Sequence, residues 1–118
     1  MAHSIYKAQT AEAKKLRKKA GQYIKSLRLV KDLTQSQLAQ RIGIEYYTFI
    51  SAVENGVNRV PPEGMKDWAM ALDVPRAQFA KNLLKFYDPY MFHELFADHE
   101  NKDADIGGLF DEQDSKSD

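Results

Sequence analysis

Residues 34–44 constrain the fold of this chain most, because they specify a short helix together with its start and its end. Thr34 can accept a hydrogen bond at the helix start, and Leu38 and Ile42 follow at a spacing of four, which places both on one side. Gly43 permits the positive φ that a tight turn after the helix needs. The segment therefore predicts a short amphipathic helix that stops at a turn.

A second short helix is expected after this turn, over about residues 46–55. Two registers are open for it. Aligning the helix on its C-terminal end directs Ile50 and Val53 to the core, whereas aligning it on the turn directs Phe49 and Ala52 there. The first register buries more aliphatic surface, so it is the one that we expect.

Helical spacing of apolar residues predicts further helices on both sides of this pair. They are expected from about Thr10 to Lys31, from Pro62 to about Asp73, from Pro75 to about residue 85, and over residues 86–97, where Asp88 would cap the helix and Pro89 would hold its first position. Gly21 is a weak point or a possible break in the first of them. Residues 1–10 carry no periodic pattern and are expected to be flexible. The chain is therefore predicted to be all-α.

An ordered set of motifs across roughly residues 20–85 resembles the Cro/CI-type (XRE) helix-turn-helix regulators. The residues that carry the resemblance are Ile24-Lys25-Ser26-Leu27-Arg28, Leu33-Thr34-Gln35, Gly43-Ile44, Ile50-Ser51, Val53-Glu54-Asn55-Gly56 and Trp68-Ala69-Met70-Ala71-Leu72-Asp73-Val74. The resemblance implies a five-helix lambda-repressor-like DNA-binding domain at residues 11–85, with its motif at residues 35–55. It also implies a partly buried salt bridge between Arg28 and Glu54. The chain departs from the family by one additional residue within residues 45–49.

The same resemblance implies a set of side chains that contact DNA. They are Gln35, Ser36, Tyr46, Tyr47, Thr48, Ser51, Asn55, Asn58 and Arg59. Gln35 would lie near a phosphate at a helix N-terminus, and Arg59 would reach the backbone from the loop after the recognition helix. The helix offers hydroxyl and amide groups rather than Arg or Lys, so strong readout of G·C pairs is not expected. Alternatively, Tyr46 or Tyr47 packs on the preceding helix.

Charge is distributed unevenly along a chain whose formal net charge is zero. Residues 1–60 hold 11 Lys and Arg against 4 Asp and Glu, whereas residues 61–118 hold 6 against 13. A basic half beside an acidic tail is typical of a nucleic-acid binder with a solvating or regulatory extension. The basic run at residues 14–19 either follows the DNA backbone or is a solvated helix face. The tail at residues 98–118 is expected to be disordered, with residues 106–110 as a possible docking motif.

Several kinds of chemistry are not expected. The chain has no cysteine, which excludes disulfides and thiolate metal sites. His3, His93 and His99 lack partners at metal-ligand spacing, and no phosphate loop or nucleophile elbow is present, so neither a metal, a cofactor nor catalysis is expected. No apolar run is long enough to cross a membrane, and a cytoplasmic location is expected.

The aromatic segment at residues 86–97 has two interpretations. It either closes the core of its own domain or pairs with a second copy, and we favour a role in dimerisation. The leading functional hypothesis is therefore a homodimeric regulator that binds specific double-stranded DNA. A repressor is expected in preference to an activator. The alternative is an antitoxin or an anti-activator that acts through protein contacts, including contacts made by the acidic tail.

Overall fold

A computed structural model describes the backbone of residues 2–97 and the side chains of residues 10–97. The regular secondary structure within these residues is all helical, which confirms the predicted all-α class. The elements are α1 (Ala2–Val30), α2 (Gln35–Ile42), α3 (Thr48–Glu54), the 3₁₀ turn η1 (Pro62–Gly64), α4 (Met65–Ala71), α5 (Arg76–Tyr87), α6 (Pro89–Phe92) and the π-helical turn η2 (His93–Ala97). The acidic tail, including residues 106–110, lies outside the described residues.

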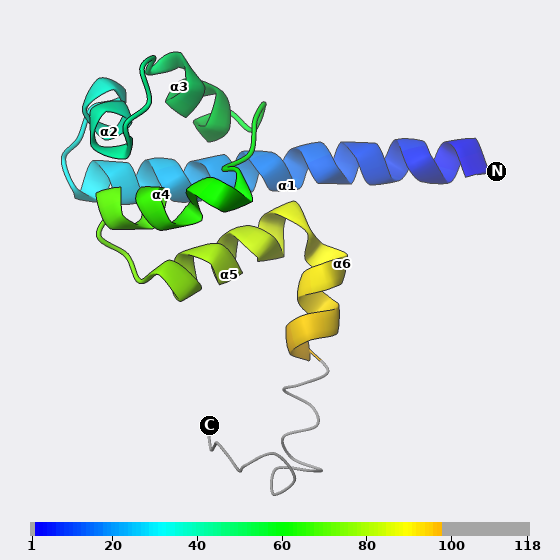
Figure 1. Ribbon diagram of the computed structural model, residues 1–118. Coiled ribbons are helices and arrows are strands. Elements are labelled where there is room, and N and C mark those ends of the chain that lie inside the picture. The colour runs from blue at the N-terminus through cyan, green and yellow to red at the C-terminus, as the bar shows by residue number, and fades with distance from the viewer. Residues whose placement is uncertain (1, 98–118) are drawn as a thin grey trace, which may run out of the picture.

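The helices are arranged around α1, which runs through the whole width of the domain and extends beyond it (Figure 1). Helices α3 and α5 pack against α1, while α4 packs against α2 and α5. The pair α2 and α3 lies on one side of α1, and α6 turns away from the end of α5. This arrangement leaves the outer side of α2 and α3 free of other described helices.

Helix α1 differs from the prediction at two places. It begins at Ala2 rather than near Thr10, so the segment expected to be flexible is helical. It also continues without a break through Gly21, where a Cβ atom would lie only 2.1 Å from the carbonyl oxygen of Glu54. Gly21 is therefore not a weak point. It is the position where α1 passes directly against the backbone at the end of α3.

Helix α2 has the start and the end that the sequence predicts. The backbone N–H of Gln37 donates to Oγ1 of Thr34 over 3.0 Å, and the backbone N–H of Thr34 donates to Oε1 of Gln37 over 2.8 Å. These two bonds form a capping box. At the other end Gly43 has a φ of 93° and its N–H donates to the carbonyl of Ala39. Local hydrogen bonding thus sets both ends of α2.

Replacing Thr34 with Ala should lower the free energy of unfolding by about 1 kcal/mol, because the cap at the start of α2 is lost. Urea unfolding followed by circular dichroism measures this change. The control is Thr34→Ser, which keeps the hydroxyl and should leave most of the stability. An equal loss in both variants would contradict the role of the hydroxyl.

Helix α3 adopts the first of the two registers. Ile50 and Val53 are completely buried, whereas Phe49 is only partly buried and packs against the core cluster. The helix begins at Thr48 rather than at residue 46. Burying both aliphatic side chains favours this register, and residues 44–47 form the connection before α3.

The core lies between α1, α4 and α5 and continues under α3. Its largest completely buried side chains are Trp68 and Phe79, and Tyr23 of α1 stacks on Phe79 with 6.2 Å between ring centroids. Phe86 and Tyr87 at the end of α5 are partly buried against this core. The N-terminal part of the aromatic segment therefore closes the domain.

Helix α4 is shorter than predicted. Pro62 lies in the separate turn η1, and α4 begins at Met65. Asp73, which follows α4, has a φ of 58°, and its carboxylate lies 2.6 Å from Nζ of Lys31. The hydrogen bond and the charge of Lys31 hold the pKa of Asp73 below its ordinary value. This surface pair links the end of α1 to the turn between α4 and α5.

Candidate nucleic-acid interface

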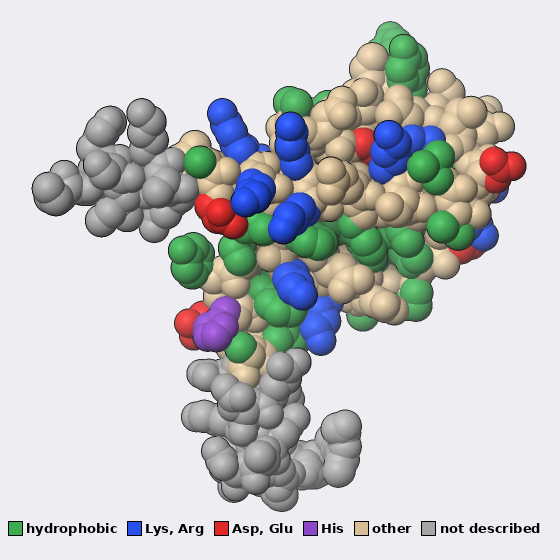
Figure 2. Space-filling model, turned by 180° about the vertical axis from the view of Figure 1, so that it is seen from behind, with side chains coloured by type: hydrophobic (Ala, Val, Ile, Leu, Met, Phe, Trp, Pro, Cys, Tyr) green, Lys and Arg blue, Asp and Glu red, His purple; other side chains and the backbone are tan. Residues whose placement is uncertain are grey.

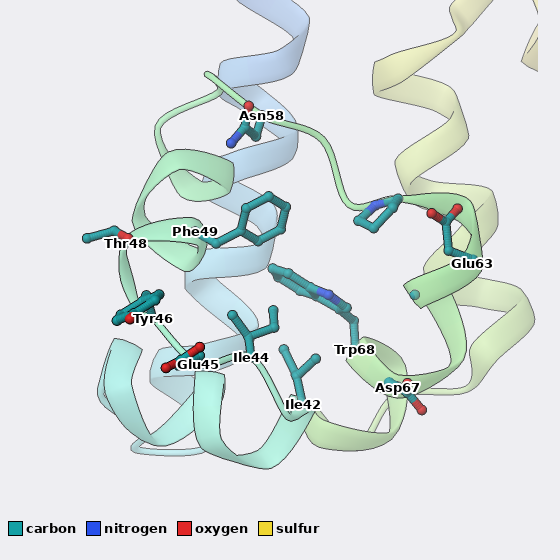
Figure 3. A pocket seen from close by; sticks show the side chains of 12 residues that line it. Ile42, Ile44, Glu45, Tyr46, Thr48, Phe49, Asn58, Glu63, Asp67 and Trp68 are labelled. Atoms are coloured by element: carbon teal, nitrogen blue, oxygen red, sulfur yellow. The ribbon is translucent and has the colours of Figure 1, made fainter.

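The N-terminal end of α3 presents polar and aromatic side chains to solvent. Tyr46 is 66% exposed and Tyr47 is 51% exposed, so neither tyrosine is packed into the interior. Figure 3 shows Tyr46 and Thr48 on the side of the α3 segment that faces away from Trp68. Tyr46 lies in the turn and Tyr47 at the cap position, so these two predicted members of the helix precede it.

The remaining predicted residues of α3 continue this surface toward the C-terminal end of the helix. Ser51 is partly buried and Asn55 is exposed. Nδ2 of Asn55 donates to Oγ of Ser51 over 3.4 Å. With Tyr47 these residues stand at successive spacings of four and therefore share one face. The outer face of α3 thus carries phenol, hydroxyl and amide groups, and no formal charge.

The starts of α2 and α3 lie next to each other. Ser36 on α2 lines the same small surface depression as Tyr46 and Tyr47, with a volume of about 330 Å³. Gln40 and Glu45 line it as well. Three side chains that the sequence predicted to act together are therefore neighbours in space.

Gln35 is the first residue of α2, and its side chain has a hydrogen-bond partner within the protein. Its Nε2 donates to Oε1 of Glu54 over 3.1 Å, so the amide is directed at a carboxylate of α3. Gln35 thereby links the first turn of α2 to the last turn of α3.

The salt bridge between Arg28 and Glu54 is present and is almost completely buried. Nε of Arg28 lies 2.6 Å from Oε2 of Glu54, and the two side chains are only 8% and 3% exposed. Nη2 of Arg28 donates to the other carboxylate oxygen, and Nη1 donates to the carbonyl of Leu33 over 2.7 Å. A single arginine of α1 thereby holds the end of α3 and the segment before α2.

The loop after α3 holds the last two predicted residues. Asn58 is exposed and lines the pocket in Figure 3. Arg59 is also on the surface, but its Nη2 lies 2.6 Å from Oδ2 of Asp88. The guanidinium carbon lies 4.6 Å from the centre of the Tyr87 ring. Arg59 is therefore not a freely solvated side chain.

Asp88 does not cap α6 as the sequence predicted. No side-chain hydrogen bond from Asp88 to the start of α6 is present. Both carboxylate oxygens accept hydrogen bonds from Arg59 instead. Asp88 thus forms an ion pair with Arg59 at the surface and does not cap α6.

The basic run at residues 14–19 lies beside the end of α3. Arg17 donates from Nε to the carbonyl of Gly56 over 3.3 Å. The backbone of Lys18 is so close to Gly56 that a Cβ there would lie 2.8 Å from its nitrogen. Figure 2 shows several Lys and Arg side chains gathered on one face of the molecule, next to the N-terminal residues drawn in grey. Residues 14–19 thus extend a positive surface away from the C-terminal end of α3.

An open apolar pocket of about 710 Å³ lies beneath the α3 segment (Figure 3). Ile42, Ile44, Phe49 and Trp68 line it, and the Phe49 ring stands edge-on to Trp68 with 6.3 Å between centroids. Phe49 therefore belongs to the support of α3, which the preferred register left undecided.

Two kinds of feature are absent from the described residues. Within residues 10–97, no group of three or more His, Cys, Asp or Glu side chains is placed to hold a metal ion. Among the helices of residues 2–97, none combines the length and the hydrophobicity needed to span a bilayer.

Comparison with known proteins adds no assignment to this geometry. No family model matches the chain, and no curated protein matches its sequence.

Proposed function

We propose that this protein is a sequence-specific regulator that binds double-stranded DNA, with α3 as its recognition helix in the major groove. The observation that carries the proposal is the outer face of α2 and α3. It presents exposed Tyr46, Tyr47 and Thr48 beside Ser36, while Ile50 and Val53 hold the opposite face of α3 in the core. Such a supported, protruding helix fits the width of the major groove. The helix order supports a five-helix lambda-repressor-like domain of the Cro/CI type.

The chemistry of this face suits a particular kind of base recognition. Hydroxyl and amide groups donate to and accept from base edges, and aromatic rings contact thymine methyl groups. Phosphate contacts would come from the neighbouring positive surface. Lys14, Lys15, Lys18 and Lys19 are all exposed on α1. Their attraction to DNA is independent of sequence and weakens with salt.

A protein contact is the second part of the proposal. Tyr90, Met91 and Leu95 are 77%, 55% and 53% exposed on α6 and η2. Exposed apolar side chains of this size are typical of association surfaces. A second copy placed here would give a two-fold dimer and therefore two DNA half-sites. The same surface also supports the alternative of an antitoxin or anti-activator that binds another protein.

Selection of binding sequences from random double-stranded DNA tests the proposal. The unaltered chain should recover a two-fold motif. The variant Tyr47→Ala/Thr48→Ala/Ser51→Ala should lose that motif, at a cost of about 1–3 kcal/mol for each base contact removed. Its salt-sensitive binding to mixed sequences should remain, because phosphate contacts carry no sequence information.

The control is Met70→Ala/Gln78→Ala, which removes two exposed, uncharged side chains from α4 and α5. This variant should recover the same motif as the unaltered chain. A motif that survives in the triple variant would show that α3 is not the reading element. Absence of DNA binding in the unaltered chain would favour the protein-interaction function.

A further inference from the structure

The loop that follows α3 is joined to the corner between α5 and α6 by Arg59. Its Nη2 donates to Oδ2 of Asp88 over 2.6 Å, and its Nη1 faces Oδ1 at 3.4 Å. The guanidinium also lies over the ring of Tyr87. The hydroxyl of Tyr87 accepts a hydrogen bond from the backbone N–H of Val60 over 3.2 Å. Two consecutive loop residues are thus held by two consecutive residues of the corner.

This ion pair engages the end of the guanidinium that binds oxyanions. An arginine contacts a phosphate through parallel N–H groups, as it does a carboxylate. In this structure both terminal nitrogens of Arg59 are directed at Asp88. The carboxylate of Asp88 therefore occupies the position at which a phosphate would bind Arg59.

The ion pair is also weak enough to exchange. The side chains of Arg59 and Asp88 are 45% and 42% exposed, so water and salt screen their attraction. A DNA phosphate held in place by the contacts of α3 could replace the carboxylate. Asp88 stands directly before Pro89, at the cap position of α6, where a released carboxylate has another hydrogen-bonding role available.

We propose that Asp88 competes with the DNA backbone for Arg59 and thereby lowers the affinity for DNA. The proposal rests on the DNA-binding function proposed above. It makes Asp88 a residue that acts through Arg59, without touching DNA itself. The corner between α5 and α6, which also begins the exposed apolar surface, becomes an element that sets affinity.

The test is Asp88→Asn, which keeps the size of the side chain and removes its charge. The variant should bind DNA about two- to fivefold more tightly, the range expected when an exposed ion pair no longer competes. The logarithm of the binding constant should also fall more steeply with the logarithm of salt concentration, by up to about 0.9. Both changes should occur on the selected motif and on mixed-sequence duplex DNA, because the added contact is to a phosphate.

The matched control is Asp73→Asn. Asp73 is a second surface carboxylate paired with a cation, Lys31. It precedes the N-terminus of α5, whereas Asp88 follows the C-terminus of that helix. This variant changes the net charge by the same amount and should alter the affinity much less. Asn also tolerates the positive φ of Asp73. Thermal unfolding of each variant verifies that it is folded before binding is measured.

The deciding measurement combines Asp88→Asn with Arg59→Ala, a variant in which Asp88 has no arginine to compete for. In that background Asp88→Asn should produce no more gain than Asp73→Asn does. An equal gain with and without Arg59, or no gain with Arg59 present, would overturn the competition. Weaker binding by Asp88→Asn would also overturn it, because Asp88 would then be orienting Arg59. If the unaltered chain binds no DNA at all, the proposed function fails first and this inference fails with it.

Discussion

Replacing Arg28 with Met should lower the free energy of unfolding by about 3–5 kcal/mol, the range measured when one partner of a buried salt bridge is removed. The carboxylate of Glu54 would remain buried with only the amide of Gln35 as a side-chain partner. The carbonyl of Leu33 would lose its donor as well. A small domain is typically stable by about 5–15 kcal/mol, so this single change approaches global unfolding.

Urea unfolding followed by the fluorescence of Trp68 measures this loss. Lys31→Met is the control, because it breaks the exposed pair with Asp73 and should change the stability much less. Adding Glu54→Gln to Arg28→Met should recover part of the loss, since the uncompensated charge disappears. If Arg28→Met were no more destabilising than Lys31→Met, the buried pair would not hold α3 to α1.

The second large effect is expected at Gly21. Its replacement with Ala should destabilise the domain by about 1–3 kcal/mol or more, as overpacking does. The new Cβ would lie 2.1 Å from the carbonyl oxygen of Glu54 and 2.7 Å from that of Val53. Both neighbours are backbone atoms, so relief requires α1 and α3 to move apart. Elsewhere in a helix the same change is favourable by about 0.8–1.0 kcal/mol.

Thermal unfolding of Gly21→Ala compared with Gly64→Ala gives the measurement. A Cβ at Gly64 would come no closer than 3.4 Å, to a side-chain atom of Pro61, and Gly64 has an ordinary negative φ. That control should therefore change stability little. Stabilisation by Gly21→Ala would contradict the close approach of the two helices, because helix propensity alone would then decide the result.

The sequence predicted those features that depend on neighbours along the chain. The cap by Thr34 and the stop at Gly43 involve residues a few positions apart, so their residue types suffice. The return bond from Gln37 that completes the capping box was not predicted. The register of α3 followed from which choice buries Ile50 and Val53. The pair of Arg28 and Glu54, by contrast, was expected only from the family resemblance.

Features that depend on distant segments could not be predicted in the same way. Asp88 precedes Pro89, and local rules therefore predict a cap, yet Arg59 approaches from 29 positions earlier and takes its carboxylate. A glycine within a helix normally indicates a weak point, as at Gly21. The presence of glycine at this position is explained by the close approach of the Glu54 backbone, which the sequence does not reveal. Gln35 likewise meets Glu54 across the fold. In each case the competing partner is specified by tertiary packing.

The attachment of α3 has a consequence for how such a chain can diversify. Its strong anchors are the buried Ile50 and Val53 and, at its C-terminal end, Glu54, which is bound by Arg28. Tyr46 and Tyr47, at the opposite end, contribute little to the core. Substitutions of these two tyrosines should therefore alter the proposed recognition surface without a large loss of stability. The first residues of that proposed surface are separate from the residues that anchor α3, whereas Ser51 lies between the buried Ile50 and Val53.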